Sequence, residues 1–369
     1  MANGLDDVVA ADTRLSDVDG ERGRLTIAGF SVEALAPHAT FEETVYLLLH
    51  DRLPSTEERD RFAADLAARR ELSPATLAAV REAAAAKAAP MSALRMAVAT
   101  LGLGGVEEPA GDALTAIAAL PAIVGAHWRT LSGDAPSPIR TDLSHAAHTM
   151  HQLTGDIPSA ERARGLETYL NTVIDHGMNA STFAARVIVS THSDVISALT
   201  GAIGALKGPL HGGAPGPALE MVFEIGEMAR AKAVIAAKLD RGERLMGFGH
   251  RVYRVRDPRA EVLASAAERF YRNGGDEHLY ELARHVEDTA LRLLRERKPG
   301  RSIQTNVEFY TALLLHGLGI PTALFTPVFA IGRVAGWSAH CLEQLREGRL
   351  IRPQSTYIGP TGRTLTTLR

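Results

Sequence analysis

Residues 245–260 read LMGFGHRVYRVRDPRA, and the rest of the chain is best interpreted from this stretch outward. Gly247 and Gly249 flank Phe248, a spacing that disfavours a continuous helix and lets another molecule approach the backbone closely. His250 follows directly. The next nine positions hold four arginines and one acid, namely Arg251, Arg254, Arg256, Arg259 and Asp257. In a chain with a formal net charge of -3, this stretch predicts a local site for anions.

Pro258 predicts where the following helix begins. Proline is excluded from helix interiors but favoured at the first helical position, so we expect Arg259 to lie in the first turn. A guanidinium held there would present its planar set of donors from a fixed point. A histidine beside glycines is as often a structural residue as a catalyst, so this stretch alone leaves both roles open for His250.

Three further stretches combine glycine breaks or helix starts with polar side chains. They are DHGMNAS at 175–181, GPLHGGAP at 208–215, and NVEF at 306–309 followed by FAIGRVAGW at 329–337. Together with GFGHRVYRVRDPRA, and in this order, they resemble the citrate synthase family in its type I, short dimeric form from bacteria and archaea. The resemblance extends over nearly the whole chain, and four motifs in the same order make it specific.

The strand and helix patterns agree with the fold that the resemblance implies. Residues 4–32 alternate apolar and polar groups around Asp19 and Gly20, which predicts a small β-hairpin, and helix-forming residues dominate after it. The resemblance implies a mainly α, two-domain helical fold with this hairpin at the N-terminus. In that fold the large domain comprises residues 1–213 and 319–369, and the small domain, on the acyl-CoA side, comprises residues 214–318.

The family condenses acetyl-CoA with oxaloacetate and water to give citrate and CoA, and each motif offers a group for this reaction. By resemblance, Glu308 is the base, His211 donates a hydrogen bond to the thioester oxygen, and His250 is the donor or acid at the oxaloacetate carbonyl. The substrate-binding residues implied are His176, Arg259, Arg333 and Arg352, supported by Asn179 and Ser181. The residues implied in CoA binding are Leu245, Gly247, Gly249, Arg251 and Arg254.

Two arginines near the C-terminus extend the anion site. Arg333 lies on an otherwise apolar helix face, where a charge without a partner is costly, so we expect it to need a carboxylate. Arg352 resembles the family's arginine that reaches into the neighbouring subunit's site. If it has that role, the enzyme is at least a homodimer.

One position departs from the family pattern. The usual aspartate is replaced by Glu308, in NVEF rather than NVDF, and Gln304 and Thr305 differ from the aromatic-proline sequence common in relatives. An extra methylene moves the carboxylate by about 1.5 Å, and a misplacement of roughly 1 Å can cost on the order of 100-fold in rate. Glutamate keeps the charge and basicity of the group, so we favour a working base.

Three alternatives remain open from the sequence. A 2-methylcitrate synthase using propionyl-CoA differs by one methylene, worth only about 1 to 3 kcal/mol in a pocket. A non-catalytic acyl-CoA-binding or citrate-binding homologue is suggested by Glu308. A metal protein is suggested by His145, His148 and His151, but structural zinc usually takes four ligands, so a partly polar helix face is favoured. We expect no metal and no cofactor, since the CoA thioester is itself a substrate.

Composition excludes several other classes. Acids and bases nearly cancel, 43 against 40, so we expect neither nucleic acid nor an anionic membrane as partner. The single cysteine, Cys341, excludes an internal disulfide and fits a reducing cytoplasm. The N-terminus does not resemble a secretory signal. We expect Pro121 to break the most apolar run, around 113–128, which falls short of the roughly 20 residues that cross a bilayer.

Overall fold

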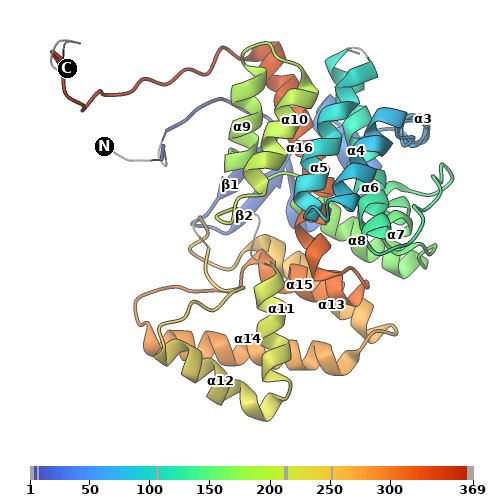
Figure 1. Ribbon diagram of the computed structural model, residues 1–369. Helices are drawn as coiled ribbons and strands as arrows, with labels where there is room; N and C mark the ends of the chain where they lie inside the picture. Colours follow the sequence, from blue (N-terminus) through green and yellow to red (C-terminus); the bar gives the residue numbers. More distant parts are fainter. Residues whose placement is uncertain (1–3, 6–7, 105–107, 212–214, 251, 364–369) are drawn as a thin grey trace.

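The computed structural model describes residues 4–5, 8–104, 108–211, 215–250 and 252–363. Its one sheet within these residues is antiparallel, with strands in the order β1-β2-β3 (Figure 1). The strands are β1 (Ser16–Asp19), β2 (Arg24–Ile27) and β3 (Phe30–Ser31). Asp19 pairs with Arg24 across the turn, and Leu25 and Ile27 are fully buried. The predicted hairpin is confirmed, with a third short strand added to it.

Helices make up most of the remaining described chain, and their starts follow the capping signals in the sequence. Thr40 with Glu43 and Ser55 with Glu58 form the capping boxes of α2 and α3. The helices of this half are α1 (Val32–Leu35), α2 (Phe41–His50), α3 (Thr56–Ala68), α4 (Pro74–Ala85), α5 (Pro90–Ala99), η1 (Thr100–Gly104), α6 (Pro109–Leu131), α7 (His145–Thr154), α8 (Ala160–Val173), α9 (Ala180–Val189) and α10 (Val195–Leu206).

The long helix α6 corrects one expectation. It runs through Pro121 without ending, so the predicted break at this proline is wrong. The helix has 23 residues and is long and apolar enough to cross a membrane, but 72% of its most apolar window is buried inside the molecule. A helix that is apolar all round is buried on all sides, and α6 packs against α4, α5, α7 and α16. It is therefore accounted for as a core helix.

The helices α11 to α15 form a separate group at the bottom of Figure 1. They are α11 (Pro215–Ile225), α12 (Met228–Asp240), α13 (Pro258–Arg272), α14 (Glu277–Arg297) and α15 (Val307–Gly317). Within the group α11 and α13 pack on α15, and α12 packs on α14. The predicted start at Pro258 is confirmed. The domain boundaries given above stay a prediction.

The chain returns to the first half through η2 (Thr322–Leu324) and α16 (Phe325–Glu347). Two glycines let α16 approach α8 closely. A Cβ on Gly332 would lie 3.0 Å from the Leu170 carbonyl oxygen, and one on Gly336 would lie 2.2 Å from the Ile174 carbonyl oxygen. This close packing places Arg333 beside the C-terminal end of α8.

The histidines of α7 do not form the partly polar face that the sequence favoured. His145 and His148 are fully buried, and His145 stacks on Phe41 with ring centroids 4.6 Å apart. Burial lowers the pKa of His148 to about 3, so this imidazole is neutral. Within the described residues, no three histidine, cysteine or acidic side chains are grouped as metal ligands.

The contact between α6 and α7 generates a stability prediction. A Cβ on Gly125 would lie 2.4 Å from the Gln152 carbonyl oxygen, whereas at Gly204 the nearest atom, Arg95 Cδ, is 3.8 Å away. We expect Gly125→Ala to lower the free energy of unfolding by about 1 to 3 kcal/mol through overpacking. Gly204→Ala, in the interior of α10, should be neutral or slightly stabilising. Urea unfolding of both variants measures the difference, and equal midpoints would contradict it.

Candidate active site

Four sequence motifs that lie far apart in the chain converge between the first half and the α11–α15 group. The segment 175–181 joins α8 to α9, and residues 207–211 follow α10. The loop 245–257 precedes α13, and Asn306 caps α15. Helix α13 packs on α8, which brings the two halves together at this point.

His176 contacts the loop that carries His250. Its Nε2 lies 3.0 Å from the Tyr253 hydroxyl, and its ring meets the His250 ring edge to face with centroids 5.9 Å apart. Burial and the neighbouring charge of Arg259 lower the pKa of His176 well below its usual value. Two predicted site histidines are therefore adjacent, and this one is neutral.

The tautomer of His250 follows from its hydrogen bonds. Its Nδ1 accepts the backbone N–H groups of Val252 and Tyr253, at 3.0 and 3.1 Å. Burial, with the charge of Arg259, lowers the pKa of His250 to about 4, so the ring is neutral and its one proton is on Nε2. His250 is therefore a hydrogen-bond donor through Nε2.

Arg259 lies in the first turn of α13 as predicted, and it is held by Asp257. The Arg259 Nε and Nη2 atoms donate to the two Asp257 carboxylate oxygens at 3.0 and 2.8 Å. Burial opposes the charge of Arg259, but Asp257 outweighs it and the pKa of the guanidinium is raised. Arg259 Nη2 also lies 3.4 Å from His250 Nε2. Both atoms carry protons, so they cannot bond to each other, and together they can donate to one acceptor.

His211 is held by a chain of hydrogen bonds that ends in α9. Asn179 Oδ1 accepts the Thr182 N–H, and the Ser181 hydroxyl, 2.8 Å away, must donate to the same oxygen. The Ser181 oxygen accepts Trp337 Nε1–H at 3.1 Å and lies 2.8 Å from His211 Nε2. In this arrangement His211 donates a hydrogen bond from Nε2 to the Ser181 oxygen, and its Nδ1 is an acceptor.

Glu308 has a buried and unpartnered carboxylate oxygen. Its backbone N–H donates to Asn306 Oδ1 at 3.0 Å, which fixes the start of α15. Its Oε2 atom is buried and has no hydrogen-bond partner among the described residues. Burial raises the pKa of Glu308 to about 7, although the charge of Arg259 opposes the shift.

Arg333 is the buried arginine expected to need a carboxylate. It is 1% exposed, its Nε donates to the Val173 carbonyl at 2.6 Å, and its guanidinium carbon lies 4.6 Å from the centre of the Phe329 ring. No acid in the described part of the chain forms an ion pair with it. Burial lowers the pKa of Arg333 to about 10, which leaves it charged near neutral pH.

The predicted CoA-binding residues are only partly brought together. Leu245 is buried, and the left-handed Gly247 and Gly249, with φ of +87° and +82°, hydrogen-bond through their backbone to residues 304–306. Arg254 is exposed. Arg251 and residues 212–214 lie outside the described residues. Arg352 is exposed and lines a cavity with residues of α9 and α16, among them Phe183, Arg186 and Glu343.

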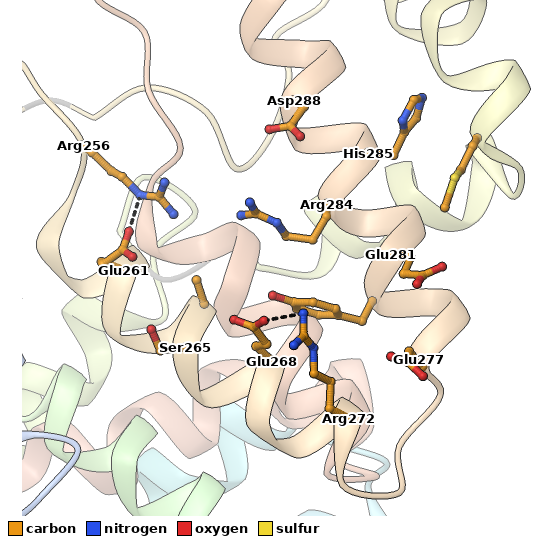
Figure 2. A pocket seen from close by; sticks show the side chains of 13 residues that line it. Arg256, Glu261, Ser265, Glu268, Arg272, Glu277, Glu281, Arg284, His285 and Asp288 are labelled. Carbon is orange, nitrogen blue, oxygen red and sulfur yellow. Dashed lines mark ion pairs between the residues drawn. The ribbon is translucent and has the colours of Figure 1, made fainter.

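Fewer arginines are available for an anion than the sequence predicted. Arg256 forms ion pairs with Glu261 at 3.0 Å and with the buried Glu287 at 3.8 Å. It lines a cavity of 570 Å³ between α13 and α14, where Arg272 pairs with Glu268 at 2.7 Å (Figure 2). Because these charges neutralise one another, this cavity is not the anion site.

Sequence reasoning missed four polar residues of the site. Tyr169 on α8 is fully buried and its hydroxyl has no partner among the described residues, while burial and then the charge of Glu308 raise its pKa. Tyr253 and Trp337 lie inside the quoted motifs, where an aromatic residue with a polar tip is a usable signal. Ser16, which donates to Asp175 at 2.5 Å, had no signal beyond its place on a strand.

The comparisons with known proteins agree with these motifs. The family model described as "Citrate synthase, C-terminal domain" matches residues 4–354. The chain is 39% identical to citrate synthase from Haloferax volcanii, over 97% of this chain and 96% of that protein. It is 38% identical to 2-methylcitrate synthase from Shewanella oneidensis, over 98% and 95%. A ternary complex of citrate synthase from Thermoplasma acidophilum with carboxymethyl coenzyme A and oxaloacetate is 32% identical, with a TM-score of 0.87 over 98% of this chain and 97% of that one. By its motifs, its fold and these relatives, the chain belongs to the citrate synthase family.

Proposed function

We propose that this enzyme condenses acetyl-CoA with oxaloacetate and water, giving citrate and CoA. A base removes a proton from the acetyl methyl group, and the resulting enolate carbon attacks the ketone carbon of oxaloacetate. The ketone oxygen gains a proton, and water then cleaves the thioester to release the CoA thiol. The observation that carries this proposal is the buried Glu308 carboxylate, whose Oε2 has no hydrogen-bond partner among the described residues and which lies near enough to Arg259 for that charge to lower its pKa.

Glu308 is the proposed base. A general base works best when its pKa lies near the operating pH, and burial brings Glu308 to about 7. The site must also stabilise the developing enolate, because a thioester methyl group is far less acidic than a carboxylic acid. The Asn306 cap holds the first turn of α15 and with it the backbone of Glu308.

His250 and Arg259 are the proposed donors to oxaloacetate. His250 Nε2–H and Arg259 Nη2–H are 3.4 Å apart and can both donate to one oxygen. A neutral imidazole with a pKa of about 4 polarises the ketone as a hydrogen-bond donor and does not carry a spare proton at neutral pH. This supports the donor role among the two that the resemblance left open for His250.

His211 is the proposed donor to the thioester oxygen, and this role requires Ser181. For Nδ1 to carry the proton, His211 Nε2 must become an acceptor, and the Ser181 hydroxyl must donate to it in place of Asn179. The Ser181 hydroxyl rotates toward Nε2, and the ring proton passes from Nε2 to Nδ1 by exchange with water. Asn179 and Ser181 therefore have a supporting role that goes beyond holding the ring.

The carboxylates of oxaloacetate are assigned to arginines. Arg333 offers a buried charge with no ion pair in the described part of the chain, Arg259 has donors left beyond its bond to Asp257, and His176 adds a neutral ring nearby. Arg352 lines a different cavity, with Phe183, Arg186 and Glu343, and by resemblance we assign it to the neighbouring subunit's site in a homodimer. A cytoplasmic location and the CoA-binding roles of Leu245 to Arg254 stay predictions.

The alternative acyl group has support from one relative. A 2-methylcitrate synthase is 38% identical over nearly the whole chain, a value close to that of the citrate synthases. One methylene changes discrimination by about 1 to 3 kcal/mol, so the motifs shared by both enzymes do not separate them. Citrate formation is favoured because it is the activity named in most of the full-length relatives.

Release of free CoA thiol with oxaloacetate present tests the function directly. We expect turnover with both thioesters and a kcat/KM for acetyl-CoA that exceeds the value for propionyl-CoA by about 10-fold or more. A higher value for propionyl-CoA would assign the enzyme as a 2-methylcitrate synthase. Binding of oxaloacetate without turnover of either thioester would favour a non-catalytic homologue.

The raised pKa of Glu308 predicts an acid limb in the rate profile. Below about pH 7 the carboxyl is protonated and cannot accept the methyl proton, so kcat/KM should rise with pH and level off above that value. The measurement uses both substrates well below saturation, between pH 5.5 and 8.5. A profile that is flat across this range would contradict the assignment of the base.

Glu308→Gln is the control for this profile. It keeps the size of the side chain and removes the base, so turnover should fall on the order of 100-fold or more. Oxaloacetate binding should persist, because the arginines are unchanged. Near-normal activity in this variant would show that another group removes the proton.

A further inference from the structure

The turn between β1 and β2 contacts the backbone of the loop that carries His250. The Gly20 carbonyl accepts the Arg254 N–H at 2.8 Å. A Cβ on Gly20 would lie 2.3 Å from the Val252 carbonyl oxygen, and one on Gly23 would lie 2.6 Å from Val255 Cγ2. The loop therefore rests directly on the turn, at a separation that only glycine permits.

The same sheet is fixed to the segment that carries His176. The Ser16 hydroxyl donates to Asp175 Oδ2 at 2.5 Å and accepts the Gly177 N–H at 2.9 Å, so it contacts both neighbours of His176. The strand also packs against this segment, because a Cβ on Gly177 would lie 3.4 Å from Val18 Cγ2. One short strand thus fixes the histidine of the first half of the chain.

The turn is rigid in its own right. Asp19 Oδ1 accepts the Arg22 N–H at 2.9 Å, and Oδ2 pairs with the side chains of Arg22 and Arg24 at 3.1 and 3.2 Å. Buried Leu25 and Ile27 anchor β2 in the core. The hairpin can therefore serve as a fixed surface against which the loop is placed.

His250 depends on the part of the loop that meets this surface. Its Nδ1 accepts the N–H groups of Val252 and Tyr253, so the position of that backbone sets both the tautomer and the direction of the ring. Tyr253 in turn contacts His176. The other end of the loop is held independently, because the Gly249 N–H donates to the Gln304 carbonyl at 2.7 Å within the α11–α15 group.

We propose that the β1–β2 turn, through the backbone of Gly20, holds His250 in position beside His176. Gly20 and Ser16 are then positioning residues for the condensation. This rests on the proposed function of His250. The turn acts through the loop and does not touch substrate. The hairpin links the two histidine-bearing segments, because Gly20 in its turn is hydrogen-bonded to the His250 loop and Ser16 in β1 is hydrogen-bonded to both neighbours of His176.

Gly20→Ala tests the contact. The φ of Gly20 is not in the left-handed region, so alanine fits the turn itself and only the loop must move. We expect amide hydrogen exchange in residues 252–256 to accelerate, while the Gly249 amide keeps its protection. We also expect kcat/KM for oxaloacetate to fall on the order of 100-fold, since a displacement of roughly 1 Å has that cost. The thermal midpoint should fall less than that of Gly125→Ala, because Val252 and Arg254 are exposed and the loop can shift without disturbing the core.

Two variants complete the experiment. Gly102→Ala is the matched control, because its Cβ would have no atom closer than Ile196 at 3.9 Å, and it should match the wild type in exchange and kinetics. Ser16→Ala adds no atom and removes the tie to Asp175 and Gly177, so it should also lower kcat/KM.

Two results would overturn the proposal. One is Gly20→Ala with unchanged exchange in residues 252–256, and the other is faster exchange with wild-type kinetic constants. Amide exchange does not require turnover, so a wild-type protein without activity would refute the proposed function and still leave the contact measurable.

Discussion

The site is organised by the buried charge of Arg333, which forms no ion pair among the described residues, although the buried Asp175 is near enough to stabilise it. Arg333 is drawn into the core because Gly332 and Gly336 bring α16 against the end of α8, and it is held there by one backbone carbonyl. Burying a guanidinium costs several kcal/mol unless an anion compensates it. With Arg259 already balanced by Asp257, the remaining positive charge is retained for a ligand. The dianionic substrate that we propose would supply negative charge opposite Arg333.

The state of the histidines follows from the same arrangement. Burial lowers the pKa values of His176 and His211, and the charge of Arg333 lowers both further. The rings are therefore neutral, and their hydrogen bonds decide which nitrogen donates. Backbone N–H groups fix the tautomer of His250, and the hydrogen bond with Ser181 sets the tautomer of His211. Burial raises the pKa of Glu308 toward neutral pH, so the environment separates the proposed base from the proposed donors.

The sequence predicted the elements whose cause is local. Proline at the first helical position and a polar cap specify the start of α13, and the capping boxes of α2 and α3 follow from residues three apart. The motifs that carry the site residues also hydrogen-bond locally, as Asn179 does at the start of α9. Such features are readable because the interacting groups are near in the chain.

Features that depend on distant contacts were not readable. Pro121 stays inside α6 because tertiary packing on several sides outweighs the loss of one helical hydrogen bond. Arg256 was counted toward the anion site, but it pairs with Glu261 nearby in the chain and with Glu287 on α14, and folding brings this second acid to it. The unpartnered Tyr169 hydroxyl and the Ser16 tie become visible only when α8 and β1 are placed beside the site.

Calorimetric titration of oxaloacetate into the wild type and Arg333→Gln tests the retained charge most directly. Glutamine keeps a donor for the Val173 carbonyl and removes the guanidinium. We predict that affinity falls on the order of 100-fold, as expected when one member of a buried charge pair is lost. Arg61→Gln, at an exposed position on α3, should bind as the wild type does. Unchanged affinity in Arg333→Gln would contradict the account, because the buried charge would then have no part in holding the substrate.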